Sequence, residues 1–197
     1  MVRGRPREFD AQDALDRVLA VFWRDGFDAA SMQALADAVG VSKPSLYAAY
    51  GNKESLYLAA LERYATTHGA ERMERLHAEP DVKRAVHEFL TSLVDAFTAT
   101  GGPPGCMIVA GTSACQASHA SAAVQGAIRM ALRAAADALE VRLRRAVTEG
   151  QLAPDPAPCA LAAYIGTVMS GLSVQARGGA SAEVLRHVVS TAMRAWP

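Results

Sequence analysis

The sequence has few cysteines, few aromatic residues and no excess of charge of either sign. Its 197 residues include three cysteines without C-x-x-C spacing, which argues against a disulfide scaffold and against a structural zinc site. A secretory signal, a membrane-length apolar run, a nucleophile elbow, a phosphate loop, a dinucleotide fingerprint and paired metal-binding histidines are lacking too. We therefore expect a cytoplasmic protein that is not an enzyme, has no membrane partner and needs neither a metal nor a cofactor.

The charge is balanced over the whole chain and basic only over short stretches. Twenty basic residues offset twenty acidic ones, so the formal net charge is zero. Arg3, Arg5 and Arg7 form a run without acidic residues, while Lys43 and Lys53 stand at the starts of predicted helices. The positive potential is therefore local, and any affinity for nucleic acid should be modest and should weaken with salt.

Helical periodicity dominates the sequence, and strand-like alternation is scarce. Hydrophobic residues make up 51% of the chain, and its length suits two domains. We predict an all-α fold of nine helices: about 10–25, two within 26–54, then 53–77, 80–99, a short one ending near 117, 121–149, 157–177 and 181–194. Residues 1–8 form a basic arm, 9–61 a first domain and 62–197 a second.

The segment 26–54 (GFDAASMQALADAVGVSKPSLYAAYGNKE) is the most informative part of the chain. Ser31 can cap a helix with apolar positions at 32, 35, 36 and 39, and Gly40 can end that helix in the left-handed conformation. Ser42 can cap the next helix, whose first turn tolerates Pro44. Two short helices joined by a glycine-containing turn form a helix-turn-helix, whose second helix enters the DNA major groove.

The motif continues with SKPSLY at 42–47, Tyr50 and GNKE at 51–54, and in this form it resembles the TetR family of bacterial transcriptional regulators. The resemblance covers about the first third of the chain. It implies an N-terminal DNA-binding domain of about sixty residues, a C-terminal domain for an effector and for dimerisation, and repression as the activity. Many members carry a histidine where this chain has Ala48 and Ala49, so one phosphate contact is expected to be missing.

The predicted DNA contacts lie on the arm, on both helices of the motif and at the start of the next helix: Arg3, Arg5, Ser31, Gln33, Ser42, Lys43, Ser45, Tyr47 and Lys53. The alternative for the two arginines is a disordered arm, and for Lys43 it is a solvated surface side chain. We interpret Leu46 and Tyr50 as packing residues. The partner is a double-stranded, near-palindromic operator bound by two copies.

The resemblance implies that the last two helices of each subunit pack as a four-helix bundle in a homodimer. Helix 157–177 is almost free of charge, which supports this expectation. The predicted interface residues are Tyr164, Ile165, Val168, Met169, Leu172, Leu185, Val188, Val189 and Met193. The alternative is burial inside one subunit.

An effector pocket is expected among the middle helices, lined by Tyr64, Phe89, Leu93, Phe97, Cys106, Met107, Gln125, Ile128 and Met130. The alternative for each residue is ordinary core packing. Because the second domain shows no cluster of charges, we expect a small molecule that is mostly apolar and either uncharged or a cationic aromatic.

Cys106 follows Pro103, Pro104 and Gly105 at the start of a predicted helix, where free N–H groups can lower a thiol pKa. This position predicts a sensor of electrophiles or oxidants, and the alternative is a small buried apolar residue. A metal sensor with Cys115 and His119 is less favoured because the three share no ligand spacing. A helical enzyme or ligand carrier with an incidental helix-turn-helix is the rival class.

Overall fold

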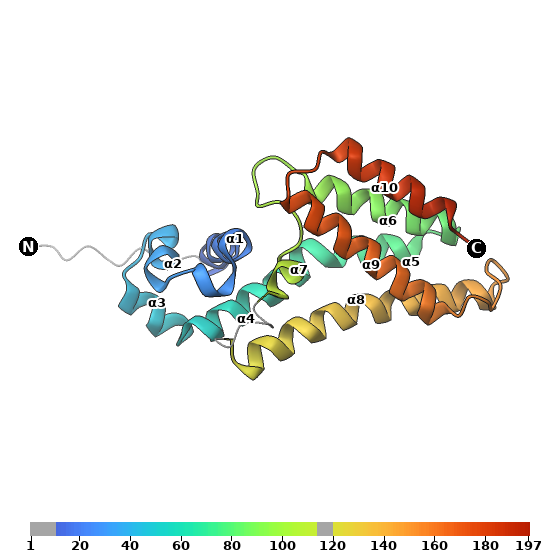
Figure 1. Cartoon of the computed structure of the whole chain (residues 1–197). Helices are drawn as coiled ribbons and strands as arrows, with labels where there is room; N and C mark the ends of the chain where they lie inside the picture. The colour runs from blue at the N-terminus through green and yellow to red at the C-terminus, as the bar shows by residue number, and fades with distance from the viewer. Residues whose placement is uncertain (1–10, 114–119) are drawn as a thin grey trace, which may run out of the picture.

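A computed structural model describes residues 11–113 and 120–197, and in these ranges every regular element is a helix (Figure 1). The elements are α1 (Ala11–Ala29), α2 (Met32–Val39), α3 (Lys43–Tyr50), α4 (Lys53–Tyr64), the π-helical turn η1 (Ala65–Gly69), α5 (Ala70–Ala78), α6 (Val82–Phe97), α7 (Met107–Gly111), α8 (Ala122–Thr148), α9 (Pro158–Arg177) and α10 (Ala182–Arg194).

α4, η1 and α5 follow one another without a break and form one long helix, as predicted. Within the two described ranges the chain therefore folds into nine helices, which confirms the all-α prediction. Gly26 has a non-helical backbone and interrupts α1, so that the regular part of α1 ends close to the predicted residue 25.

The caps of the helix-turn-helix are those that the sequence predicts. Ser31 Oγ accepts a hydrogen bond from Ala34 N at 3.1 Å, and Ser42 Oγ accepts one from Ser45 N at 3.2 Å. Gly40 ends α2 with φ 82° and ψ 31°, a left-handed conformation that few other residues adopt without strain. Local chemistry therefore fixes the turn between α2 and α3.

The first hydrophobic core joins α1 to α4 and continues beyond the helix-turn-helix. Phe22, Leu35, Leu46 and Tyr57 are buried in it, and Met107, Ala120, Val124 and Ile128 of the later segments belong to the same cluster. The ring of Tyr57 meets those of Phe22 and Phe27 edge to face, with centroids 5.0 and 5.2 Å apart. The helices α1 to α4 are thus packed directly on α7 and on the start of α8.

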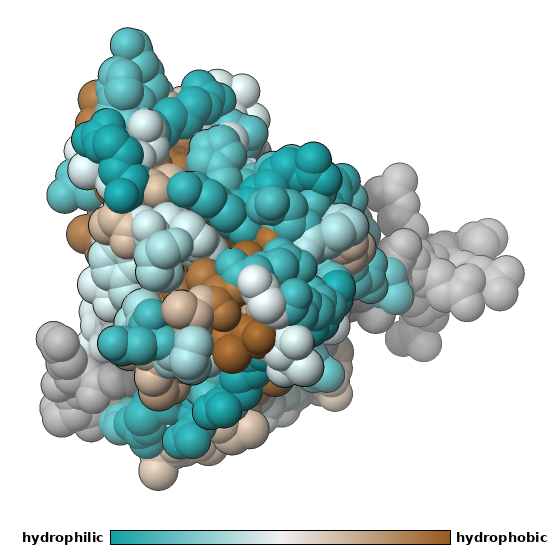
Figure 2. All heavy atoms as spheres, turned by 90° about the vertical axis from the view of Figure 1, so that its right-hand side faces the viewer, coloured by the Kyte–Doolittle hydropathy of each residue, from teal (hydrophilic) through white to brown (hydrophobic). Residues whose placement is uncertain are grey.

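The second core lies between α5, α6, α8, α9 and α10. Arg142 of α8 is fully buried beside it and donates to the carbonyl oxygens of Leu76, Glu79 and Pro80 at 3.2, 2.8 and 3.0 Å. Those carbonyls belong to the C-terminal end of the long helix and the residues after it, where a cation is favourable. Figure 2 shows the end of the molecule opposite the helix-turn-helix, where mostly hydrophilic residues surround an apolar area.

The expectation that the chain lacks an apolar run of membrane-spanning length was wrong. α9 is 20 residues long with a mean hydropathy of 1.3 over its most apolar window, so its length and composition alone would allow it to cross a membrane. In the fold α9 packs against α6, α8 and α10, and its buried side chains include Leu161, Ile165 and Leu172. The core of a helical bundle requires the same apolar composition.

Candidate DNA interface and effector cavity

The second helix of the motif, α3, presents most of its side chains to solvent. Ser42, Lys43, Ser45 and Tyr47 are exposed, and Tyr47 leaves 44% of its surface accessible. Leu46 is buried in the first core, as predicted, and holds α3 in place. The outward face therefore presents an ammonium group, hydroxyl groups and an aromatic ring, which are groups that contact phosphates and base edges.

Four of the predicted DNA contacts are engaged in local hydrogen bonds. Ser31 and Ser42 cap helices, and Ser42 Oγ also lies 2.8 Å from Ser45 Oγ. Gln33 Nε2 donates to Asp37 Oδ1 at 2.7 Å. Arg3 and Arg5 lie outside the described residues. These positions remain predictions.

Lys53 is placed differently from our expectation. Its Nζ donates to Asp28 O at 3.1 Å and lies 4.7 Å from the centroid of the Phe27 ring. Burial lowers the pKa of Lys53, against the opposing charge of Asp28. The cap of α4 is Asn52, which accepts from Ser55 N at 2.9 Å. The ammonium group of Lys53 thus ties α4 to the end of α1.

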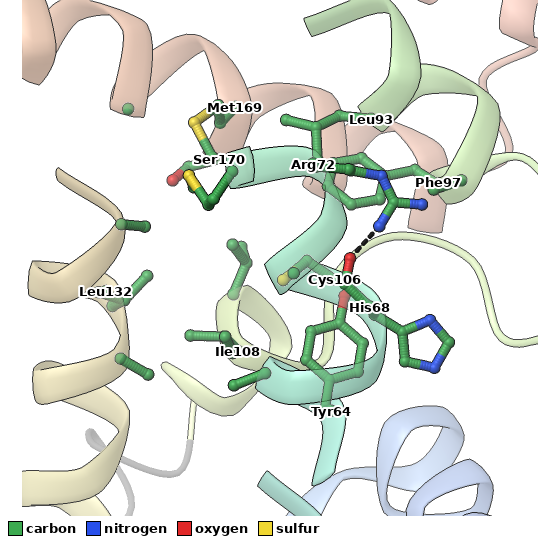
Figure 3. Close-up of a pocket in the computed structure, with 18 of the residues that line it drawn as sticks. Tyr64, His68, Arg72, Leu93, Phe97, Cys106, Ile108, Leu132, Met169 and Ser170 are labelled. Carbon is green, nitrogen blue, oxygen red and sulfur yellow. Dashed lines mark hydrogen bonds between the residues drawn. The ribbon is translucent and has the colours of Figure 1, made fainter. Parts of the chain in front are cut away.

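A cavity of about 860 Å³ lies in the second domain, between the long helix and α6, α7, α8 and α9 (Figure 3). Five of the predicted pocket residues line it, namely Tyr64, Phe89, Leu93, Phe97 and Cys106. Its volume falls within the range of ligand pockets. The sequence therefore predicted the position of the cavity through the residues of α4 and α6.

The other four predicted pocket residues do not line the cavity. Met107 and Ile128 are buried in the first core, and Gln125 donates to the backbone oxygen of Ala120. Met130 is 73% exposed. The physical reason is the orientation of α8 about its own axis. The side chains of α8 that line the cavity are those of Ala131, Leu132, Ala134, Ala135, Ala136 and Leu139.

Sequence reasoning missed several polar residues of the cavity wall, among them Trp23, His68 and Arg72. The four-residue spacing of Tyr64, His68 and Arg72 was a usable signal, because such residues share one face of a helix. No sequence signal connected Trp23, which belongs to α1 and was interpreted as part of its apolar stripe.

The aromatic residues at this end of the cavity are packed together. The rings of Tyr64 and His68 stack with centroids 5.0 Å apart, and Trp23 meets them edge to face at 4.9 and 5.3 Å. Burial raises the pKa of Tyr64, and Cys106 adds to this through its charge and a hydrogen bond. Burial lowers the pKa of His68, and the charge of Arg72 adds to it, although Asp16 opposes the change. The phenol and the imidazole are therefore neutral near pH 7.

Cys106 stands immediately before α7, as predicted, and is half-buried in the cavity wall. Its backbone N–H donates to Ser173 Oγ at 2.8 Å, while its side chain makes no capping hydrogen bond with α7. Cys159 is exposed, and Cys115 and His119 lie outside the described residues. No group of three metal-ligating side chains occurs in the described parts of the chain.

Arg177, near the end of α9, connects three segments of the fold. Its Nη1 donates to Trp23 O at 3.0 Å and to Pro104 O at 3.4 Å, and its Nη2 donates to Arg24 O at 3.3 Å. A Cβ at Gly105 would come within 2.7 Å of both Arg177 Cγ and Ser173 O. The segment before Cys106 is thus tightly fitted between α9 and α1.

Comparison with known proteins identifies the family. Residues 14–60 match the family described as bacterial regulatory proteins, tetR family. The chain is 31% identical over 196 residues to the HTH-type transcriptional repressor ComR of Escherichia coli K12, which covers 99% of this chain and 92% of ComR. The chain belongs to the TetR family. Its members are DNA-binding regulators and not enzymes, which confirms that expectation.

Two further members of the family are similar to this chain over most of its length. The HTH-type transcriptional repressor BdcR of Escherichia coli K12 is 32% identical over 184 residues, with 93% of this chain and 87% of BdcR covered. A cysteine mutant of the TetR family transcriptional regulator CifR, in complex with 26-base-pair double-strand operator DNA, is 39% identical. It superimposes with a TM-score of 0.92 over 98% of this chain and all of that chain.

The interface predicted for a TetR-family dimer needs a correction. Ile165, Leu172, Leu185, Val189 and Met193 are buried in the second core, because these sides of α9 and α10 face α6 and each other. For these five residues the structure agrees with the alternative interpretation, which is burial inside one subunit.

The other predicted interface positions lie farther out. Met169 lines the cavity, and Val168 is half-buried against the core. The predicted residues Tyr164 and Val188 are exposed by 41% and 42%, and two residues outside the predicted set, Val174 and Val184, are exposed by 58% and 53%. We call these last four residues the outer apolar face. They are the large apolar side chains that α9 and α10 leave uncovered within the described subunit.

Proposed function

We propose that the protein is a transcriptional repressor that binds a near-palindromic operator as a homodimer in the bacterial cytoplasm and leaves it when a ligand enters the cavity or Cys106 is modified. The observation that carries this proposal is that Trp23 belongs to the DNA-binding domain and also lines the cavity. A molecule in the cavity therefore touches the domain that holds the recognition helix. The names of ComR and BdcR and the operator complex of CifR support the repressor assignment.

The DNA interface centres on α3. Lys43 and Tyr47 are exposed on its first turns, whereas Ala48 and Ala49 offer no polar group to a phosphate. With a net charge of zero, the chain has little long-range attraction for DNA. Useful affinity therefore requires two subunits that bind two half-sites at once.

The outer apolar face supports dimerisation through α9 and α10. Tyr164 and Val174 lie on α9, and Val184 and Val188 lie on α10. Large apolar side chains that two neighbouring helices leave exposed are a feature of subunits that associate through those helices. Pairing of these helices with a second copy would set the distance between the two recognition helices.

Release requires a free energy of coupling between the cavity and α3. A ligand that prefers a different spacing of α4, η1 and α5 would move α4, on which α1 to α3 are packed. The two recognition helices would then no longer fit successive major grooves. Arg177 adds a second connection, from α9 to the backbone of α1.

Modification of Cys106 is the covalent route to the same release. A thiolate at Cys106 adds to an electrophilic carbon, so that an S–C bond forms and the thiol proton is taken up by the adduct or by solvent. The thiol lines the cavity beside Tyr64, so an adduct would occupy the ligand space. The adduct would then press against α4 and α7.

The DNA-binding part is tested by fluorescence polarisation with the DNA upstream of the gene. Lys43→Ala and Tyr47→Ala should each weaken binding by about tenfold, because each removes a phosphate or base contact. Lys83→Ala, an exposed lysine on α6, is the matched control and should leave the affinity unchanged. Equal affinities for all three variants, with intact folds by circular dichroism, would contradict the assignment of α3.

The covalent part is tested with N-ethylmaleimide in a Cys115→Ser, Cys159→Ser background, which leaves one thiol. Alkylation should weaken operator binding, and a further Cys106→Ser substitution should abolish the response. If the protein without Cys106 responds equally, the cysteine has no sensing role.

A further inference from the structure

Four side chains that can donate hydrogen bonds gather at one end of the cavity. Trp23, Tyr64, His68 and Arg72 line this end, which we call the donor end. Among the described residues that line the cavity there is no aspartate, glutamate or lysine, and Arg72 carries the only full charge. The cavity is therefore suited to a ligand with acceptor atoms and with negative charge. It offers no counter-ion to a cation.

One donor at this end lacks a partner. Trp23 is 7% exposed, and its buried Nε1 has no hydrogen-bond partner in the structure. Buried N–H groups in native proteins are nearly always paired, because an unpaired one has given up its hydrogen bond to water and gained none in return. An acceptor atom on a bound ligand would supply the missing partner once the side chains that cover this N–H move aside.

A second donor has spare capacity. Arg72 donates to the carbonyl oxygen of His68, and Figure 3 shows its guanidinium group beside His68 and Phe97. No carboxylate in the described part of the chain forms an ion pair with Arg72, whereas Arg75 on the next turn pairs with Glu71. A guanidinium group has five N–H donors and matches a carboxylate in geometry and charge.

Apart from Thr167 and Ser170 of α9, the rest of the cavity is lined mainly by apolar side chains. Leu93 and Phe97 come from α6, Leu132 from α8 and Met169 from α9, and alanines of α8 and α9 leave space between them. Figure 3 shows Leu132 and Met169 on walls away from His68. A ligand that fills both parts needs an acceptor group at one end and an apolar body at the other.

We propose that the cavity binds an amphipathic monocarboxylate, with the carboxylate at Arg72 and Trp23 and the apolar chain between α6, α8 and α9. The inference rests on the proposed function, because it assigns a chemical class to the same effector cavity. It replaces the expectation of an uncharged or cationic aromatic ligand. A cationic ligand would meet the charge of Arg72 and no carboxylate.

The test is isothermal titration of the full-length protein with octanoate, 1-octanol and octylammonium, which share one apolar chain. Octanoate should bind about tenfold or more tightly than octanol, since the hydrogen bonds of a charged pair are strong. Octylammonium should bind most weakly. An equal or tighter affinity for octanol or octylammonium would overturn the proposal.

Variants locate the carboxylate. Arg72→Gln should weaken octanoate binding about tenfold and leave octanol binding nearly unchanged, while Arg75→Gln on the exposed side of the same helix should alter neither. Trp23→Phe keeps the ring and removes the N–H, and it should weaken octanoate binding by a smaller factor. If Arg72→Gln leaves the preference for octanoate over octanol intact, the donor end is not the carboxylate site.

Operator affinity measured on the same samples separates the two proposals. Octanoate that binds through Arg72 without lowering operator affinity supports the ligand class and contradicts the effector role of the cavity. If the protein binds its operator but does not bind octanoate, the proposed ligand class is wrong and the proposed DNA-binding function is unaffected.

Discussion

The two halves of the long helix have opposite surroundings. α4 buries five side chains in 12 residues, whereas α5 buries only Leu76 in nine. α4 lies in the first core beneath α1, and α5 borders the cavity of about 860 Å³. One helix thus provides a firm support for the DNA-binding helices and a loosely packed wall for a ligand, and stability and responsiveness are assigned to different ends of it.

The largest expected effect comes from making the same substitution in the first core and at the cavity. Leu56→Ala in the first core should lower the free energy of unfolding by about 2–5 kcal/mol, because it opens a void among fully buried side chains. Leu132→Ala at the cavity should cost about 1 kcal/mol or less, since one side of Leu132 already faces open space. Urea denaturation at one fixed protein concentration measures both. Equal losses would contradict the division.

The second prediction contrasts the outer apolar face with an exposed valine elsewhere on the surface. Val188→Glu on the outer apolar face should raise the dimer dissociation constant about tenfold or more, because a charge would be buried in the contact. Val141→Glu on α8 has a similarly exposed valine and should not change it. Sedimentation equilibrium provides the measurement, and dimers of equal strength would place the interface elsewhere.

The third prediction concerns the connection between α9 and α1. Arg177→Ala should lower the stability of α1 by about 1 kcal/mol, because three carbonyl oxygens lose a charged donor in a partly exposed site. Hydrogen exchange of the amides in α1 should become faster. Arg194→Ala is the control, since that side chain bonds only to Thr191 among the described residues. Unchanged exchange in Arg177→Ala would show that the first core alone holds α1.

The smallest effect is expected at the outer edge of the α1–α4 contact. The Arg63 guanidinium group hydrogen-bonds Asp16 and lowers the pKa of that carboxyl group, with N···O distances of 2.8 and 2.9 Å. The pair therefore stabilises the fold above the unfolded pKa near 3.8, and this contribution is lost as the pH falls through the folded value.

Because half of the Asp16 side chain is exposed, Asp16→Asn should cost at most about 1 kcal/mol at pH 7. The difference from the wild type should disappear in acid. Chemical denaturation at pH 7 and at several pH values below 3.8 measures this, and a difference that does not shrink as the pH falls would refute the ion pair as its cause.

The sequence predicted the features that depend on neighbours in the chain. Ser31, Gly40 and Ser42 act as caps because their partners lie within a few residues. Cys106 was placed correctly at a helix start, but its neighbours Ser173 and Tyr64 come from distant helices that no local pattern connects to it.

Side-chain direction around a long helix was the other limit. The apolar pattern of α9 and α10 could not separate Val188, which is exposed, from Val189, which is buried, because both faces are apolar. On α8 an error of one or two positions moved the prediction from Leu132 to Met130. Trp23 was assigned to the first core, and its second role arises only where the first domain meets the cavity.

The π-helical turn between Tyr64 and Ala70 sets the relative orientation of the DNA-facing and ligand-facing sides of the molecule. A π turn contains one more residue than the matching α-helical path, and each residue of an α-helix corresponds to a rotation of about 100°. Deleting one residue from this turn would favour a regular helix and would oppose the contacts of α1 with α7 and with Arg177 of α9, which also hold the first domain in its present direction. The extra residue of the turn therefore lets one long helix satisfy the packing at both of its ends.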